Sequence, residues 1–200
     1  MAKLSIVVPC YNEQETIPLF YPAVEKVVRQ MPVETEYWFV NDGSSDQTLA
    51  ELRKLHDQNP ERVHYVSFSR NFGKEAGLYA GLEATTGDYV VVMDADLQDP
   101  PEYLPEMYQE ISSGEYDCVG MRRTDRKGEA KFKSFLSNQF YNVINKISDT
   151  KIVPGARDYR MMTRQMVDAV LSLKEYNRFS KGIFNWVGFK TKYLPYKNVE

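Results

Sequence analysis

The strongest constraint on the fold is a regular alternation of short apolar runs with helical patterns. Runs rich in branched or aromatic residues have the length of buried β-strands and lie at 4–8, 37–40, 63–68, 89–93 and 117–121. Between them, apolar residues recur at helical spacing, although Pro18 and Pro22 interrupt the first of these helices. This βαβ rhythm predicts an α/β fold, with a mostly parallel, Rossmann-like central sheet flanked by helices.

Length and composition favour one compact domain over residues 1–200. A chain of 200 residues, 42% of them hydrophobic, can bury one sizeable core. Lysine and arginine total 25 against 28 acidic residues, so the formal net charge of -3 predicts no nucleic-acid partner. Cys10 and Cys118 have no neighbour at metal-ligand spacing, and we expect buried free thiols in a reducing compartment.

No apolar run approaches the ~20 residues that a membrane span requires. We therefore expect the chain itself to be soluble and cytoplasmic. Whether a membrane segment follows residue 200 is left open, as is the oligomeric state, including a homo-oligomer.

Three polar clusters follow predicted strands, at the edge of the sheet where α/β proteins bind ligands. They read "PCYNE", "NDGSSD" and "DADLQD". If the chain stays extended after the fourth strand, Asp94, Asp96 and Gln98 point the same way, and their oxygens suit Mg²⁺ or Mn²⁺ with a diphosphate as co-ligand. Asp99 has a simpler interpretation, as the cap of a helix that opens at Pro100.

The second cluster and the segment after the third strand carry weaker signals. Asp42 can accept hydrogen bonds from a nucleobase or a ribose, and Gly43 permits a tight turn. The segment "GKEAGLYAG" has neither the P-loop nor the dinucleotide-binding order of glycines. Lys74 in this segment either approaches a phosphate or is a solvated lysine at a helix start.

Seven segments together resemble the family 2 glycosyltransferases, which have the GT-A fold. The segments are "SIVVPCYNE", "VNDGSSD", "SRNFGKEAG", "GDYVVVMDADLQDPPE", "GMRR", "GARDYRMM" and "RFSKGIFNWVGF", and they span nearly the whole chain. Within the family they resemble the branch of dolichyl-phosphate mannose synthases and bacterial undecaprenyl-phosphate glycosyltransferases. The Q-x-x-R-W signature of processive polysaccharide synthases does not occur in the sequence.

The resemblance implies roles for individual residues. For the nucleotide-sugar donor it implies contacts from Pro9, Tyr11, Glu13, Val40, Asp42, Lys74, Asp94 and Ala95. It places the metal on Asp96 and Gln98, and the chemistry on Asp94, Asp96 and Asp158, although Asp158 could instead pair with Arg157 or Arg160. Phosphate or acceptor contacts are implied for Arg122, Lys133, Ser137, Arg178 and Lys181. Trp186 is expected in the core.

The segment 130–147 has apolar residues at helical spacing, which fits either core packing or a helix on the membrane surface. Lys133 and Ser137 lie one helical turn apart in it, as acceptor-phosphate contacts do in similar enzymes.

The resemblance implies an inverting, metal-dependent enzyme. It would move a hexose from a nucleotide diphosphate sugar, with UDP favoured, to polyprenyl (undecaprenyl) phosphate at the cytoplasmic face of the membrane. The alternative acceptor is a hydroxyl of a saccharide or a cell-wall polymer. A nucleotidyltransferase is disfavoured because "PCYNEQET" replaces the glycine- and arginine-rich loop of that class, and the intact "DADLQD" argues against an inactive binding module.

Overall fold

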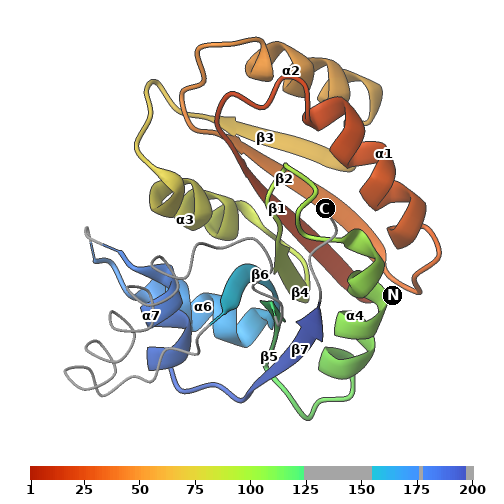
Figure 1. Cartoon of the computed structure of the whole chain (residues 1–200), viewed down its shortest axis with the longest axis vertical. Helices are drawn as coiled ribbons and strands as arrows, with labels where there is room; N and C mark the ends of the chain where they lie inside the picture. The colour runs from red at the N-terminus through yellow and green to blue at the C-terminus, as the bar shows by residue number, and fades with distance from the viewer. Residues whose placement is uncertain (124–154, 176–177, 197–200) are drawn as a thin grey trace, which may run out of the picture.

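The computed structural model describes residues 1–123, 155–175 and 178–196. These residues form a seven-stranded sheet in the order β3-β2-β1-β4-β6-β5-β7 (Figure 1). The strands are β1 Lys3–Cys10, β2 Glu34–Asn41, β3 Val63–Ser67, β4 Tyr89–Val92, β5 Cys118–Arg123, β6 Ala156–Thr163 and β7 Thr191–Tyr196. All five strands expected from the sequence are confirmed.

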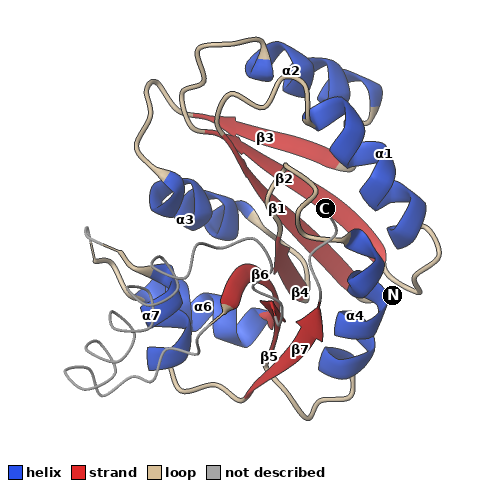
Figure 2. Ribbon diagram, in the orientation of Figure 1, coloured by secondary structure: helices blue, strands red, loops and turns tan. Residues whose placement is uncertain are grey.

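Helices cover both faces of the sheet (Figure 2). One face carries α1 Ile17–Val28, α2 Thr48–Gln58, the short 3₁₀ helix η1 Pro101–Tyr103 and α4 Leu104–Ser112, and its core contains Ile6, Phe20, Phe39 and Met107. The other face carries α3 Lys74–Ala84, α6 Arg164–Ser172 and α7 Ser180–Trp186, with Val7, Leu78, Val92 and Phe184 in its core. The alternating side chains of β1, Ile6 and Val7, thus enter different cores, as the period of a strand requires.

The sheet is mostly parallel, as predicted. The pairs β1–β2, β1–β4, β2–β3 and β5–β7 are parallel. The exception is β6, which lies between β4 and β5 and runs antiparallel to both. Because of this direction, β6 begins at the edge of the sheet where β4 ends.

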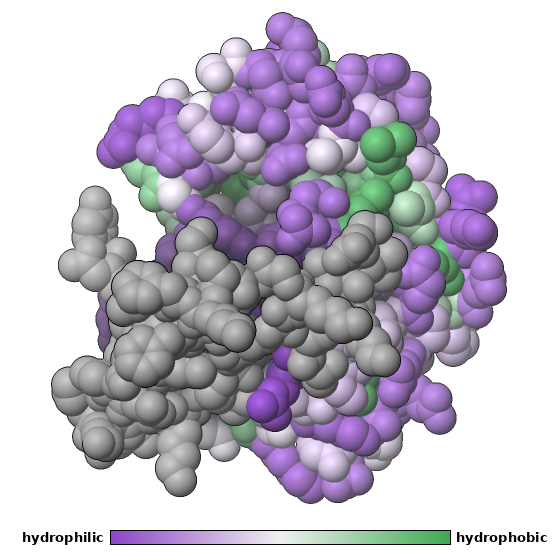
Figure 3. All heavy atoms as spheres, in the orientation of Figure 1, coloured by the Kyte–Doolittle hydropathy of each residue, from purple (hydrophilic) through white to green (hydrophobic). Residues whose placement is uncertain are grey.

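The two prolines do not prevent α1. Pro18 lies in the first turn, where a missing N–H costs nothing, and Pro22 lies inside the helix. The helix forms because its stripe of apolar residues is buried against the sheet: Ile17, Phe20, Val24 and Val28. Seen from the side of Figure 1, the described surface is mostly hydrophilic, apart from a small hydrophobic area over α1 (Figure 3).

Close packing of α3 on the sheet depends on Gly81. A Cβ at this position would lie 2.4 Å from Cγ1 of Val7, whereas a Cβ at Gly77 would meet nothing nearer than 3.7 Å. The close approach brings the first turn of α3, with Lys74, to the carboxyl end of β1.

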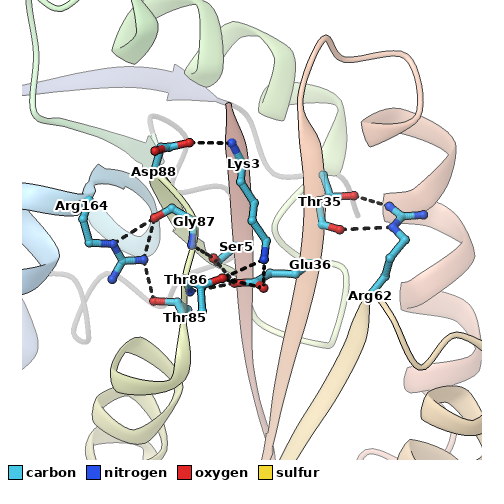
Figure 4. A network of polar contacts seen from close by, with 10 residues as sticks. All are labelled: Lys3, Ser5, Thr35, Glu36, Arg62, Thr85, Thr86, Gly87, Asp88 and Arg164. Carbon is cyan, nitrogen blue, oxygen red and sulfur yellow. Dashed lines mark hydrogen bonds and ion pairs between the residues drawn. The ribbon is translucent and has the colours of Figure 1, made fainter. Parts of the chain in front are cut away.

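A buried polar network stabilises the opposite end of the strands. The carboxylate of Glu36 accepts hydrogen bonds from the hydroxyl of Ser5 at 2.6 Å and the backbone N–H of Thr86 at 2.8 Å, and it pairs with Lys3 at 2.5 Å (Figure 4). Burial alone would raise the pKa of Glu36, but these partners outweigh it and lower the pKa to about 2. Glu36 is therefore a charged group that the fold both buries and satisfies.

Two side-chain expectations have opposite outcomes. Cys10 and Cys118 are buried free thiols, as expected. Trp186 was expected in the core, but it is 64% exposed, because Ile183 and Phe184 form the buried side of α7. Among the described residues, no helix has the length and apolar character needed to cross a membrane.

Candidate active site

A cavity of about 330 Å³ lies beyond the carboxyl ends of β1, β2 and β4. Its lining includes most of the residues that the sequence implied for the donor: Pro9, Tyr11, Glu13, Asp42, Lys74, Asp94 and Ala95, together with Asp96. Cys10, Asn71, Gly73 and Gly77 also line it; they lie in segments that carry the family resemblance, but the sequence implied no donor contact for them. Val40 is fully buried and lies beneath Gly77. The three polar clusters therefore meet at one site.

Asp42 closes the base of this cavity and holds the loop before α3. It is 4% exposed, and its carboxylate accepts hydrogen bonds from the backbone N–H groups of Phe72 at 2.6 Å and Gly73 at 2.9 Å. Its neighbour Gly43 has a φ of +62°, and a Cβ there would lie 2.2 Å from the carbonyl carbon of Arg70. Asp42 thus orders the cavity wall, which is a structural role beyond the nucleotide contact expected from sequence.

The first cluster is fixed to the second by side-chain to backbone hydrogen bonds. The N–H of Asn12 donates to the hydroxyl of Ser44 at 2.9 Å, and the N–H of Ser45 donates to Oδ1 of Asn12 at 2.9 Å. The N–H of Glu13 donates to the hydroxyl of Thr48 at 2.7 Å. These bonds leave the ring of Tyr11, 49% exposed, at the cavity mouth.

Lys74 lies between two carboxylates from distant segments of the chain. Its ammonium is 2.7 Å from Oδ1 of Asp94 and 3.0 Å from Oδ2 of Asp158. Lys181 approaches Asp158 from the other side, at 3.9 Å. Asp94 follows β4, Asp158 belongs to β6 and Lys181 to α7, so elements far apart in the sequence contribute to one charge cluster.

This cluster shifts the titration of its members. Burial lowers the pKa of Lys74, but Asp94 and Asp158 outweigh it and raise that pKa above the ordinary value. Burial raises the pKa of Asp158, but Lys74 and Lys181 outweigh it and lower that pKa. Lys74 is therefore a cation and Asp158 an anion at neutral pH.

The prediction that Asp94, Asp96 and Gln98 share one face of an extended chain is wrong. β4 ends at Val92, and Leu97 adopts a φ of +58°, so the chain turns directly after the strand. The N–H of Gln98 donates to Oδ1 of Asp96 at 3.0 Å, which closes the turn. Asp94 faces Lys74, while Asp96 and Gln98 are exposed.

The prediction that Asp99 caps the following helix is also wrong. Pro100 holds the cap position of η1, and Asp99 turns inward, where it is 1% exposed and Oδ2 accepts the N–H of Asp94 at 3.2 Å. Burial raises the pKa of Asp99 to about 6, and the N–H of Asp94 and the guanidinium of Arg157, 3.8 Å away, only partly oppose it.

The exposed oxygens of this turn fit a hard divalent cation. Asp96 offers a carboxylate and Gln98 an amide oxygen, which also accepts a hydrogen bond from Arg157 at 3.3 Å. Among residues 1–123, 155–175 and 178–196 there is no group of three His, Cys, Asp or Glu that could hold a metal. Mg²⁺ commonly uses one or two protein carboxylates and fills its other positions with water and substrate phosphates. The oxygens of Asp96 and Gln98 are therefore ligands of the kind that bind a metal ion together with a diphosphate.

The residues implied for phosphate contacts lie in different parts of the structure, and only some of them are near the cavity. Arg122 is exposed near the end of β5, and Lys181 reaches the charge cluster. Arg178 lies outside the 330 Å³ cavity and lines a second one of about 840 Å³, where its guanidinium donates to the carbonyls of Val170 and Leu173 and stacks over Tyr79 at 4.6 Å. Lys133, Ser137 and the whole segment 130–147 lie outside the described residues.

A mostly parallel sheet with a cavity beyond the carboxyl ends of β1, β2 and β4 is the architecture of the GT-A fold. The chain belongs to glycosyl transferase family 2, whose model matches residues 5–171.

Similar proteins agree with this assignment. The chain is 44% identical over 197 residues to the putative glycosyltransferase CsbB of Bacillus subtilis, covering 98% of this chain and 59% of the relative. It is 42% identical over 198 residues to the bactoprenol glucosyl transferase of Shigella phage SfX, covering 99% and 64%. The chain thus spans about three-fifths of the length of these relatives.

A solved structure supports the fold. The mannosyltransferase PcManGT of Pyrobaculum calidifontis, in complex with GDP-Man and Mn²⁺, superposes with a TM-score of 0.64 at 20% identity, covering 97% of this chain and 55% of that one.

Proposed function

We propose that this chain carries the catalytic site of an inverting glycosyltransferase that moves a hexose from a UDP-sugar to polyprenyl phosphate at the cytoplasmic face of the membrane. The cavity at the carboxyl ends of β1, β2 and β4, with Lys74 held between Asp94 and Asp158, is the observation that carries the proposal. The names of relatives that are bactoprenol glucosyl transferases favour glucose as the sugar and undecaprenyl phosphate as the acceptor.

The donor fits the cavity by chemistry. Pro9 and Tyr11 offer surfaces to a nucleobase, Asp42 and Glu13 accept hydrogen bonds, and Lys74 offers positive charge to a diphosphate. Asp96 and Gln98 would hold Mg²⁺ or Mn²⁺ against that diphosphate. When bound, such a cation neutralises the charge that develops on the leaving group.

The transfer requires little base catalysis. An oxygen of the acceptor phosphate attacks the anomeric carbon as the bond to the donor diphosphate breaks, which inverts that carbon and releases the nucleoside diphosphate. A phosphate monoester has a second pKa of ~6, so it is largely ionised at neutral pH. The lowered pKa of Asp158 makes this carboxylate a weak base and supports a role in orienting Lys74 and Lys181.

Transfer of a radiolabelled UDP-hexose, followed with polyprenyl phosphate or a saccharide as acceptor, tests the proposal. We expect label in the lipid, with formation of UDP. Label in the saccharide alone would show that the acceptor is a saccharide hydroxyl and not the lipid phosphate. No turnover with either acceptor would overturn the proposal.

Binding of Mn²⁺ in the presence of UDP, measured by electron paramagnetic resonance, tests the metal separately. Substitution of a group at a metal site commonly costs 10- to 100-fold in affinity, and we expect at least about tenfold for Asp96→Asn. Asp57→Asn, on the exposed side of α2, is the control and should bind normally. Equal affinity in both variants would remove Asp96 from the site.

A further inference from the structure

Helix α7 begins against the first turn of α3, and one carboxylate joins the two. Oε2 of Glu75 accepts the backbone N–H of Ser180 at 3.0 Å and also the hydroxyl of Ser180. Ser180 is 5% exposed, so water competes little for these bonds. Hydrogen bonds to an ionised acceptor are roughly twice as strong as neutral ones.

Glu75 supplies what the start of α7 lacks. The cap residue of this helix is Phe179, whose side chain cannot accept a hydrogen bond, and the helix has only 7 residues. A helix this short is unstable without outside contacts, and the N–H groups of its first turn favour a nearby negative charge. The carboxylate of Glu75 therefore acts as a cap donated by another helix.

The same two helices also meet in the charge cluster. Lys74, next to Glu75, contacts Asp158 at 3.0 Å, and Lys181, next to Ser180, lies 3.9 Å from Asp158. Three contacts thus form a closed ring: α3 to α7 through Glu75 and Ser180, α3 to β6 through Lys74, and α7 to β6 through Lys181. Because the ring is closed, the bond between Glu75 and Ser180 limits how far Lys74 and Lys181 can move apart at Asp158.

We propose that Glu75 is a positioning residue that holds α7 so that Lys181 stays beside Asp158 and converges with Lys74 on one bound anion. Glu75 lies in the segment "SRNFGKEAG", but the sequence implied no role of its own for it, because its partner is more than a hundred residues away. The functional part of this inference rests on the proposed function, in which the lysines contact phosphate groups. The structural part does not depend on it.

The structural part is tested on the full chain with Glu75→Gln, and the matched control is Glu83→Gln. Glu83 is exposed on the same helix and lines the same second cavity. We expect hydrogen exchange of the amides in Ser180–Trp186 to rise about tenfold in Glu75→Gln, as for a lost charge-assisted hydrogen bond, with α1 and α2 unchanged.

Labelling of Lys181 by an amine-reactive reagent, quantified by mass spectrometry against the exposed Lys54, should rise in parallel. Unchanged exchange and unchanged labelling would overturn the inference.

The functional part is tested by a double-mutant cycle of Glu75→Gln and Ser180→Ala on kcat/KM for the UDP-sugar donor, whose diphosphate is the anion proposed for Lys74. Glu75→Gln should lower kcat/KM about tenfold, and Ser180→Ala, which keeps the backbone N–H bond to Glu75, should lower it less. The double variant should lose no more than Glu75→Gln alone, and the KM for the acceptor should stay within about twofold. Additive losses, or loosened exchange with unaltered transfer, would overturn the positioning role. If the wild-type chain transfers no sugar, the proposed function fails, while exchange and labelling still decide whether Glu75 fixes α7.

Discussion

The ammonium of Lys74 lies 2.7 Å from Oδ1 of Asp94. This pair joins the first turn of α3 to the chain leaving β4, at the wall of the candidate donor cavity. The sequence allowed two interpretations of Lys74: a contact to a phosphate, or a solvated lysine at the start of a helix. Its place between Asp94 and Asp158 supports the first interpretation, since an anion entering the cavity meets a cation that is already oriented.

Replacing Lys74 by Met should weaken binding of UDP by about ten- to a hundredfold, because Asp94 and Asp158 would face the diphosphate without their cation. Lys74→Arg keeps the charge and should retain part of the affinity. Isothermal titration with UDP measures the effect, and Lys54→Met on the exposed side of α2 is the control. A Lys74→Met variant that binds UDP normally would contradict the proposed phosphate contact.

The lowered pKa of Asp158 predicts a specific pH profile. Asp158 is already ionised well below neutral pH, so the rise of kcat/KM with pH should follow groups that titrate at about pH 6, which are the acceptor phosphate and Asp99. Asp158→Asn should lower kcat and leave that rise in place. If the rise disappears in the variant, Asp158 is a general base and the orienting role is wrong.

Packing of α3 can be tested with a pair of glycines. Gly81→Ala forces a Cβ against Val7 and should reduce the free energy of unfolding by about 1–3 kcal/mol. Gly77→Ala meets only ordinary contacts and should be neutral or stabilising by ~0.5–1 kcal/mol, as for Gly to Ala in a helix. Urea unfolding of both variants measures the difference, and equal effects would contradict the close approach at Gly81.

The Glu36 network predicts how stability depends on acid. The pKa of Glu36 is about 2 in the fold against 4.5 for the free group, so its contribution is complete above pH 4.5 and is lost as the pH falls toward 2. At one pKa unit per 1.36 kcal/mol, this contribution is about 3 kcal/mol.

Glu36→Gln should therefore lower the free energy of unfolding at neutral pH and flatten its decline between pH 4.5 and 2. Glu34→Gln, exposed on the same strand, should behave as wild type. Urea unfolding at a series of pH values distinguishes them. Parallel curves for wild type and Glu36→Gln would contradict the assigned pKa.

The sequence predicted those parts of the fold that rest on apolar periodicity. All five expected strands formed, and the polar clusters at their ends met in one cavity. It did not reveal β6, because Arg157, Asp158 and Arg160 interrupt the apolar pattern. Arg160 is nevertheless 1% exposed, with its guanidinium stacked over Phe184 at 4.2 Å. Cation–π stacking of this kind leaves no periodic signal.

The errors at the site have a local cause. Periodicity assumes that a strand continues until a glycine or proline stops it, but Leu97 turns the chain with a positive φ that a leucine rarely adopts. The turn at residues 95–96 separates Asp94 from Asp96, and after Leu97 the side chain of Asp99 is buried. Contacts such as Lys74 to Asp158 and Glu75 to Ser180 join residues from distant segments, and no spacing rule reports them.

Glu36 and the candidate donor cavity lie at opposite ends of β2. The stability of the protein can therefore be altered through Lys3, Ser5 and Thr86, which lie at the end of the sheet far from the candidate active site. Changes of substrate specificity would be made at the other end, around the cavity. The free energy of unfolding and the substrate specificity of this protein can therefore be changed separately.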